Sequence, residues 1–360
     1  MEVCHQFQMC GIECCLHPRC QEPPPPDPLL LQLLDRRGPD CRRQGTVVAT
    51  PDLALSYSST VLWLQGSSIS PQPVTDHQGN LLMWNGDVFN REDFGEVEGE
   101  ESDTSMLARQ LFQASTDQEV LEVFGKVRGP WATVLLHSAT SSLWFGRDYF
   151  GRSSLLQRWE GHQLRLASVA PVNLSYTEVP ALGVFQLLLP SLRLVLHPWA
   201  GRQVEEQEKF SLSPLPLLAP VHMDQFSLVW QPEDLPEQEV FTNLLLRPRV
   251  AAAVAQLLSL LRTSVARRVV EHQPQRCKDC LPLPSCAHAA VSVLLSGGVD
   301  STLLALLVAQ ALPSRPLDLV NVAFQQKDGG FEVPDRLTGR EAVQVGGGDN
   351  IYVGPLGPEI

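Results

Sequence analysis

The sequence has 360 residues, enough for two domains at the usual size of about 100–200 residues each. Hydrophobic residues make up 44% of the chain, which allows a sizeable core and argues against global disorder. The formal net charge of −13 argues against nucleic acid or an anionic membrane surface as the main partner, because both attract basic proteins.

The N-terminal segment lacks the long apolar run of a signal peptide, and no stretch of about 18 apolar residues is free of both charge and proline. We therefore expect neither secretion nor a membrane span. The chain has nine cysteines, six of them before residue 42. In this setting they are expected to be thiols in a reducing compartment rather than a disulfide framework, so the expected location is cytoplasmic.

The chain from residue 9 to residue 199 has the pattern of a strand-rich α+β domain. A polyproline segment, Pro23–Pro28, precedes a leucine-rich helical segment, and a second helical window lies near Thr104–Gln113. The short β-type runs are separated by Gly, Asn, Ser and Pro; they are GTVVA, LALSYSSTVLWL, NLLMWNG, WATVLLH, SLWFGRD, HQLRLASV and GVFQLLLPSLRLVLHPW.

A different organisation follows. Residues 200–238 are polar, acidic and proline-bearing, which is typical of a linker. Residues 243–270 are rich in Ala and Leu with helical periodicity, which Pro248 is expected to break early.

A βαβ-type unit comes next, with strand AAVSVLL, helix TLLALLVAQAL and strand LDLVNVAF. We expect residues 239–341 to form an incomplete α/β domain. The Gly-rich remainder, residues 342–360, is expected to be an irregular tail.

The sharpest local motif is VSVLLSGGVDSTLLAL, where a strand runs into two glycines and a helix begins. Glycines let the backbone approach a ligand closely, and the N–H groups at a helix start bind anions. No Lys follows, so this is not the phosphate loop of kinases and GTPases. The alternative is a plain strand-to-helix turn, but six matched positions favour the SGGxDS pyrophosphate loop of ATP-pyrophosphatases. The predicted nucleotide-binding residues are Leu295, Ser296, Gly297, Gly298, Asp300 and Ser301, with Asp300 as a candidate Mg²⁺ ligand.

Cys10, which follows Met9, is a candidate nucleophile. A thiol of pKa about 8.5 needs a base, and an α-amine of pKa about 8 on the same residue can serve as one. Residues 1–9 would keep the Cys10 nitrogen in an amide, which is no base, so reactivity depends on whether they stay attached. An amide hydrolase also needs an oxyanion hole, and Asn85 and Gly86 offer a side-chain amide and a backbone N–H. An Asn-Gly pair alone is more often a hairpin turn.

Together these pieces resemble the glutamine-hydrolysing asparagine synthetase family, over about residues 9–341. Asp103 falls where that family holds the amine of glutamine. The matching segments are Met9–Ile12 for the start of a class-II glutamine amidotransferase domain, Arg37–Asp40 for its RGPD segment, Asn85–Asp87 for its NGE motif and Trp144–Gly151 for its xGRDxxG hairpin.

The resemblance implies an Ntn-hydrolase-like amidotransferase sandwich followed by a partial ATP-pyrophosphatase (adenine nucleotide alpha-hydrolase-like) domain. It implies that Cys10 hydrolyses glutamine, with Asn85 and Gly86 at the oxyanion and Asn85, Gly86, Asp87 and Asp103 holding the substrate. It further implies that ATP, with Mg²⁺, adenylates aspartate, which ammonia then converts to asparagine.

Two departures of this chain from the family pattern argue against the implied activity. The family holds the α-carboxylate of glutamine with an Arg before the NGE motif, whereas this chain has no Arg between Arg43 and Arg91. The family's later GEGxDE-type loop has no counterpart, so we expect this chain alone to make no asparagine. The alternative function is therefore an inactive paralogue that serves as a scaffold for a protein partner.

The segment CKDCLPLPSCAH contains Cys277, Cys280, Cys286 and His288. Zinc could bind at this spacing, but a single cluster in a Pro-rich loop favours ordinary thiols, and we expect no zinc.

Overall fold

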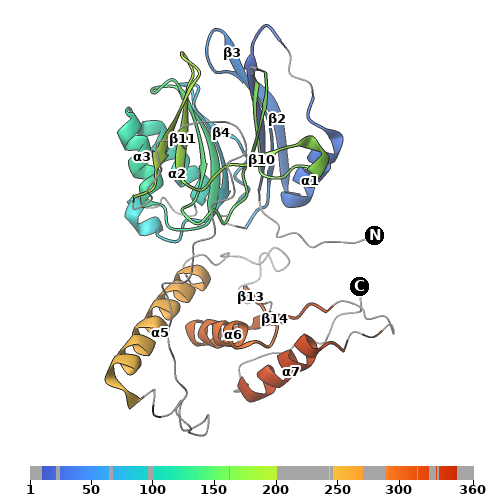
Figure 1. Cartoon of the computed structure of the whole chain (residues 1–360), viewed down its shortest axis with the longest axis vertical. Coiled ribbons are helices and arrows are strands. Elements are labelled where there is room, and N and C mark those ends of the chain that lie inside the picture. The colour runs from blue at the N-terminus through green and yellow to red at the C-terminus, as the bar shows by residue number, and fades with distance from the viewer. Residues whose placement is uncertain are drawn as a thin grey trace, which may run out of the picture. The chain divides into compact units, whose positions relative to one another are not determined.

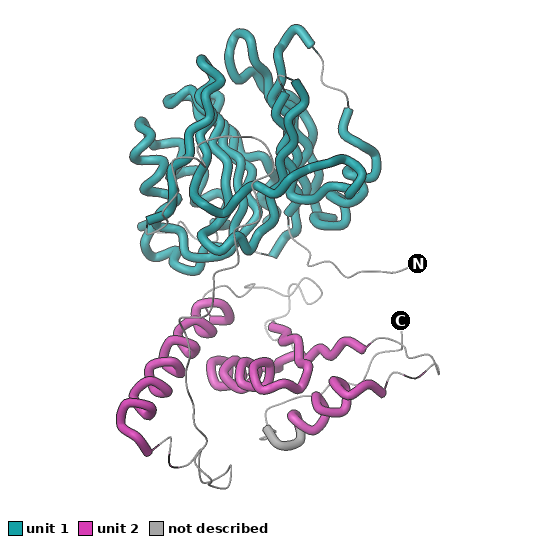
Figure 2. Tube along the Cα trace, in the orientation of Figure 1, with its two compact units in different colours: residues 1–219 teal, residues 220–360 magenta. Residues whose placement is uncertain are grey.

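The computed structural model describes residues 10–21, 25–64, 68–95, 101–161, 163–200, 243, 246–270, 289, 291–313, 315–323, 330 and 332–346. The chain divides into two compact units, Met1–Ala219 and Pro220–Ile360, shown in separate colours in Figure 2. The predicted linker, residues 200–238, lies outside the described residues except for its first residue.

The first unit contains two six-stranded antiparallel sheets. In one sheet β1 (Gly11–Pro18) pairs with β3 (Leu53–Val61) on one side and with β9 (Gln163–Ala167) on the other. The strand order of this sheet is β10-β8-β9-β1-β3-β2, and its remaining members are β2 (Cys41–Val48), β8 (Leu156–Glu160) and β10 (Thr177–Glu178).

The other sheet has the order β12-β11-β7-β6-β5-β4. Its strands are β4 (Val74–Thr75), β5 (Leu81–Gly86), β6 (Trp131–His137), β7 (Ser142–Arg147), β11 (Gly183–Leu188) and β12 (Arg193–Pro198). Because β4 has two residues only, Trp84 in β5 has no strand neighbour on that side. The Gln72 side chain takes that place: its Nε2 donates to the Trp84 carbonyl at 2.8 Å, and its Oε1 accepts from the Trp84 N–H at 2.7 Å.

The main core lies between the two sheets. Alternate residues of β1, namely Ile12, Cys14 and Leu16, are buried there, as the two-residue period of a strand requires. They pack in one cluster with residues from the facing sheet such as Met83 and Phe145.

Helices cover the outer faces of both sheets, which gives four layers (Figure 1). On one side α2 (Asp103–Gln113) and α3 (Asp117–Lys126) share a cluster with Trp84, Trp131 and Trp144. On the other side α1 (Pro28–Arg37) buries Leu30 and Leu34 against Ala167. Short 3₁₀ helices cover Arg91–Phe94 and Val172–Leu174. The predicted α+β sandwich is therefore confirmed.

One helix of the first unit did not follow from the sequence pattern. We expected a single helical window near Thr104–Gln113, and α3 follows it after a short turn. Its start has a capping box, in which the Thr116 hydroxyl accepts from the Glu119 N–H and the Glu119 carboxylate accepts from the Thr116 N–H.

The second unit has a parallel pair of strands, β13 (Val291–Leu294) and β14 (Leu317–Val320), joined through α6 (Val299–Ala311). The predicted βαβ unit is thus present. Helix α5 (Pro248–Val269) packs with α6 through Val265, Val269, Leu307 and Val308. Asn243 and Leu246 are also helical, Arg247 is extended and α5 begins at Pro248, so the predicted early break in the helical segment is present at this proline.

One expectation about this unit is corrected. Helix α7 covers Pro334–Gly346, so residues 342–346, expected in an irregular tail, complete a helix. Helix α5 is long and apolar enough to cross a membrane by length and composition, although it contains Pro248 and Arg262, so the expected absence of a span stays a prediction. One such helix is weak evidence for a span.

Candidate active site

A pocket of about 140 Å³ opens where β5 ends and where the chain enters β1. It brings together Cys10, Asn85, Gly86, Asp87 and Asp103, the residues predicted for glutamine hydrolysis and binding. The rest of its lining is Val61, Leu62, Trp63, Leu64, Ser70, Gln72, Trp84, Ser102, Thr104, Pro130 and Ser153.

Cys10 directly precedes β1, and its Sγ lies 3.9 Å from the Leu62 carbonyl oxygen. Burial raises the pKa of this thiol, and the nearby carboxylate of Asp87 raises it further, while the contact with the Leu62 carbonyl and the Arg37 charge oppose both. The thiol is therefore a poorer nucleophile at neutral pH than a free cysteine unless a base removes its proton.

Arg37, the last residue of α1, contacts Cys10. Its Nε donates to the Cys10 carbonyl oxygen at 3.5 Å, and its side chain is buried. Its Nη2 has no hydrogen-bond partner among the described residues. The next residue, Gly38, lies so close to β3 that a Cβ there would be 2.5 Å from the Thr60 carbonyl carbon. The Arg37–Asp40 segment thus holds α1 against β3 beside Cys10.

Asn85 and Gly86 form the end of a strand and not a hairpin turn, since they pair with Ala132 and Trp131 of β6. A Cβ at Gly86 would lie 2.2 Å from the Pro130 carbonyl oxygen, so only glycine fits this approach. Asn85 is 1% exposed, and its Nδ2 has no hydrogen-bond partner within the described part of the chain. A buried amide donor without an acceptor is costly in a folded protein, and here it lies at a pocket that contains a thiol.

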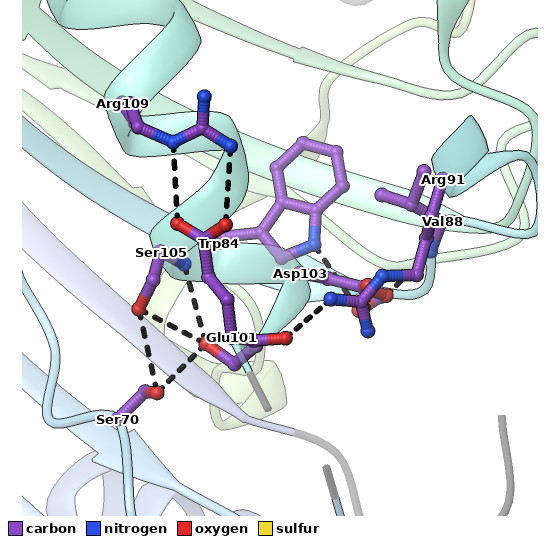
Figure 3. Close-up of polar contacts among 10 residues, drawn as sticks. Ser70, Trp84, Val88, Arg91, Glu101, Asp103, Ser105 and Arg109 are labelled. Carbon is purple, nitrogen blue, oxygen red and sulfur yellow. Dashed lines mark hydrogen bonds and ion pairs between the residues drawn. The ribbon is translucent and has the colours of Figure 1, made fainter. Parts of the chain in front are cut away.

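Asp103 begins α2 and is 2% exposed. Its Oδ2 accepts a hydrogen bond from the Val88 N–H at 2.7 Å, and its Oδ1 lies 3.4 Å from Nη1 of Arg91 (Figure 3). Arg91 also donates through Nη2 to the Glu101 carbonyl oxygen, and the Glu101 carboxylate pairs with Arg109 at 3.1 Å. The carboxylate at the helix start is therefore already balanced by one guanidinium.

A small group of hydroxyls lies beside this ion pair. Ser102, the N-cap of α2, accepts from the Ser105 N–H and receives a hydrogen bond from Ser70 at 2.7 Å. Figure 3 shows Ser70 and Ser105 near the start of the helix. Ser70, Ser102 and Thr104 all line the pocket.

The turn after β7 is hydrogen-bonded to the start of β6, the strand that pairs with Asn85 and Gly86. Asp148 accepts hydrogen bonds through Oδ2 from the Trp131 N–H at 3.2 Å and the Arg152 N–H at 2.9 Å. Gly151 completes the turn with a φ of +66°, a conformation that favours glycine. Since Trp131 is the β-partner of Gly86, the Trp144–Gly151 segment indirectly positions the end of β5.

The sequence did not single out the wall formed by Trp63, Leu64, Ser70 and Gln72. These residues lie in an irregular stretch between β3 and β4, where no periodicity identifies a buried face. The only feature that the sequence analysis noted in this stretch was the absence of any Arg between Arg43 and Arg91.

In the second unit the predicted phosphate loop joins β13 to α6. Gly297 has a φ of +86°, and a Cβ there would lie 2.3 Å from the Gly339 nitrogen of α7. The Ser296 and Ser301 hydroxyls lie 3.2 Å apart, and Thr302 Oγ1 is buried without a partner among the described residues. Asp300 lies in the first turn of α6 and is exposed. Leu295, also predicted here, is buried at the end of β13.

This loop fits an anion, because a tight glycine turn, a helix start and an unpaired hydroxyl converge there. For a metal it offers less, since no group of three or more His, Cys, Asp or Glu side chains within the described ranges could hold one. The predicted thiol segment, residues 277–288, lies outside the described residues, as do residues 1–9, so both remain predictions. Among the described cysteines, Cys10, Cys14, Cys15, Cys20 and Cys41 are free thiols.

Two regions of the chain match models of known protein families. Residues 60–172 match the family model described as glutamine amidotransferase domain, and residues 285–349 match the model described as asparagine synthase. Asparagine synthetase domain-containing protein 1 from Bos taurus is 32% identical over 87% of this chain and 55% of that protein. Asparagine synthetase domain-containing protein CG17486 from Drosophila melanogaster is 30% identical over 85% of this chain and 58% of that protein.

Among solved structures, glutamine phosphoribosylpyrophosphate amidotransferase from B. subtilis aligns with 52% of this chain and 49% of that chain. The TM-score is 0.38 at 14% sequence identity. The chain spans about half the length of the curated relatives that it matches. The predicted resemblance is confirmed: the chain is similar to asparagine synthetase domain-containing proteins over about 85% of its length, and it contains one region that matches a glutamine amidotransferase domain and another that matches asparagine synthase.

Proposed function

We propose that the first unit hydrolyses the side-chain amide of a glutamine substrate, with Cys10 Sγ as the nucleophile. The observation that carries this proposal is the buried Asn85 Nδ2, which has no acceptor in the described structure and lies at the pocket that Cys10 also lines. An unpaired donor is what a developing oxyanion requires.

The reaction follows from these groups. Cys10 Sγ attacks the amide carbon, and its proton passes through a base to the departing nitrogen, which leaves as ammonia. Asn85 Nδ2 and the Gly86 N–H hold the oxyanion during this step. Water then cleaves the Cys10 thioester and gives a side-chain carboxylate. Asp87 and Asp103 are the groups proposed to receive the substrate amine.

The base is proposed to be the α-amine of Cys10 itself. No His or Lys is among the described residues that line the pocket, and burial raises the pKa of the thiol. The α-amine exists only when the bond between Met9 and Cys10 has been cut. Glutamine hydrolysis therefore requires that cleavage.

The second unit is proposed to bind the phosphates of ATP at Ser296–Ser301, next to the unpaired Thr302 hydroxyl. Asp300 would be one ligand of a Mg²⁺ ion, which would neutralise phosphate charge there. By its likeness to asparagine synthase, the whole protein would use ammonia and ATP to convert aspartate to asparagine, in the cytosol.

The test begins with the intact mass of the protein from its own cells, which shows whether Cys10 is the first residue. The protein beginning at Cys10 is then assayed for ammonia release from glutamine and from glutamine derivatives, beside Cys10→Ala and the protein that retains residues 1–9. We expect activity only in the first of these three proteins. Equal inactivity of all three towards every substrate would overturn the proposal and favour the scaffold alternative.

A further inference from the structure

The charges around the pocket suggest which glutamine derivative it takes. We propose, on the basis of the proposed function, that the substrate is a glutamine whose α-carboxyl group is blocked in an amide bond, namely the N-terminal glutamine of a peptide, rather than free glutamine.

The described residues that line the pocket include carboxylates and no cationic side chain. Asp87 and Asp103 are the only charged side chains among the described lining residues. Three undescribed segments neighbour these residues in sequence, 1–9, 65–67 and 96–100, and none of them contains Lys or Arg. Free glutamine would bring a carboxylate to a wall whose charges are negative, whereas its ammonium would be attracted.

The guanidinium groups of Arg37, Arg91 and Arg109 lie outside the pocket lining, and of these Arg37 has an Nη2 without a hydrogen-bond partner among the described residues. Arg91 pairs with Asp103 and donates to the Glu101 carbonyl oxygen, while Arg109 pairs with the Glu101 carboxylate (Figure 3). Arg37 is buried behind the nucleophile, where its Nε donates to the Cys10 carbonyl oxygen. None of the three lines the pocket.

The wall beside Asp103 offers neutral groups instead. The hydroxyls of Ser70, Ser102 and Thr104 can donate to an amide carbonyl, which needs no charged partner. Next to them, Trp63 and Leu64 present an apolar surface, and Leu64 is 60% exposed. An exposed apolar side chain at the pocket wall suits the passage of a peptide to solvent.

These contacts determine how the substrate lies. The scissile amide of the substrate lies at Cys10 and its α-amine lies at Asp87 and Asp103. The one other non-hydrogen substituent of the substrate Cα is its carboxyl carbon. That carbon must face the hydroxyls and the apolar wall. The reaction is otherwise unchanged: the C–N bond of the glutamine side-chain amide is cut, water is consumed, and ammonia and an N-terminal glutamate are formed.

The test uses the protein that begins at Cys10 and extends to Ile360, with Cys10→Ala as the blank. Its substrates are L-glutamine, L-glutaminyl-glycine and N-acetyl-glutaminyl-glycine. Mass spectrometry identifies glutamyl-glycine as the product and distinguishes it from pyroglutamyl-glycine, which forms without an enzyme. We expect kcat/KM for glutaminyl-glycine to exceed that for glutamine by about tenfold or more, because one charge-assisted contact is worth a factor of about ten to a hundred.

A positively charged variant tests the electrostatic reason. Leu64→Arg is expected to raise kcat/KM for free glutamine about tenfold, whereas the neutral control Leu64→Gln is not. Equal or better use of free glutamine by the unmodified protein would overturn the proposal, and so would a preference that Leu64→Arg leaves unchanged. Hydrolysis of none of the three substrates would instead contradict the proposed glutamine hydrolysis itself.

Discussion

Asp103 Oδ2 accepts a hydrogen bond from the backbone N–H of Val88 at 2.7 Å, so the first residue of α2 is tied to the chain two residues after Gly86. The same carboxylate lies 3.4 Å from Arg91. The predicted amine-binding group therefore also fixes the segment that carries the predicted oxyanion donors.

These two roles can be separated. Asp103→Asn retains an oxygen that accepts from Val88 but loses the charge, so it should raise KM for substrates with a free α-amine by about ten- to a hundredfold and change stability little. Steady-state kinetics on amine-bearing and N-acetylated substrates check this, since the variant should not discriminate against the acetylated substrate.

Asp103→Ala removes both functions. It leaves the Val88 N–H without its acceptor and Arg91 without its carboxylate, so we expect the free energy of unfolding to fall by about 3 kcal/mol. Urea unfolding of both variants measures the difference. A stability loss of the same size in Asp103→Asn would show that the charge, and not the hydrogen bond, holds the segment.

Asn85 offers the clearest separation of activity from stability. Asn85→Ala should lower kcat by a factor of about 10²–10³, because an oxyanion donor is lost. Its melting temperature should change little, since Nδ2 has no partner in the described structure.

The matched control is Asn80, which is equally buried but fully engaged. Its Nδ2 donates to Asp76 Oδ2 at 2.7 Å, and its Oδ1 accepts from the Ser138 N–H at 2.8 Å. Asn80→Ala should therefore lower the melting temperature and leave kcat unchanged. The opposite pattern in the two variants would remove Asn85 from the oxyanion site.

Glu13 should make stability depend on pH. Burial raises the pKa of its carboxyl group to about 7, although Arg165, 3.4 Å away, lowers it. Because the folded value lies above the unfolded value, the stabilising contribution is present below about pH 4.5 and is lost as the pH rises towards 7. The loss amounts to about 3 kcal/mol.

Glu13→Gln removes this titration. Relative to the unmodified protein, the variant should gain about 3 kcal/mol in the free energy of unfolding between pH 4.5 and pH 7.5. Denaturant unfolding at a series of pH values measures it, with the exposed Glu122→Gln as the control. Parallel pH profiles for Glu13→Gln and the unmodified protein would contradict the prediction.

The phosphate loop makes a steric prediction. Gly297→Ala would place a Cβ 2.3 Å from the Gly339 nitrogen at a φ of +86°, so the loop must move and pyrophosphate or ATP binding should be lost. Gly339→Ala is the control, because a Cβ there would meet Asn321 Nδ2 at 3.2 Å, a tight contact that a small shift of the amide relieves. Calorimetric titration with pyrophosphate compares the two, and retained binding by Gly297→Ala would contradict the assignment of the loop.

The sequence predicted those parts of the fold that local pattern encodes. The β-type run NLLMWNG predicted a strand, and the glycines of residues 297–298 predicted a strand-to-helix turn. The Cys10 and Asn85 segments were recognised from motifs far apart in the chain, and β1 and β5 face each other across the core.

The remaining parts depend on tertiary contacts. Helix α3 begins only four residues after α2 ends, and the sequence pattern predicted one helical segment where there are two helices. The Thr116–Glu119 capping box, which marks the start of α3, was nevertheless present in the sequence. The wall at Trp63, Ser70 and Gln72 has no period, because an irregular segment takes its shape from the elements that it packs against. The Asp103–Arg91 pair joins residues whose spacing alone gives no reason to match them.

Gln72 has a consequence beyond the pocket. Where β4 stops, the N–H and carbonyl of Trp84 have no strand to pair with among the described residues, and both Trp84 and Gln72 are buried. The Gln72 side-chain amide hydrogen-bonds to both of these backbone groups, so one side chain takes the place of the next residue of the neighbouring strand. A substitution such as Gln72→Leu would leave both backbone groups buried without a partner, so it should lower the free energy of unfolding.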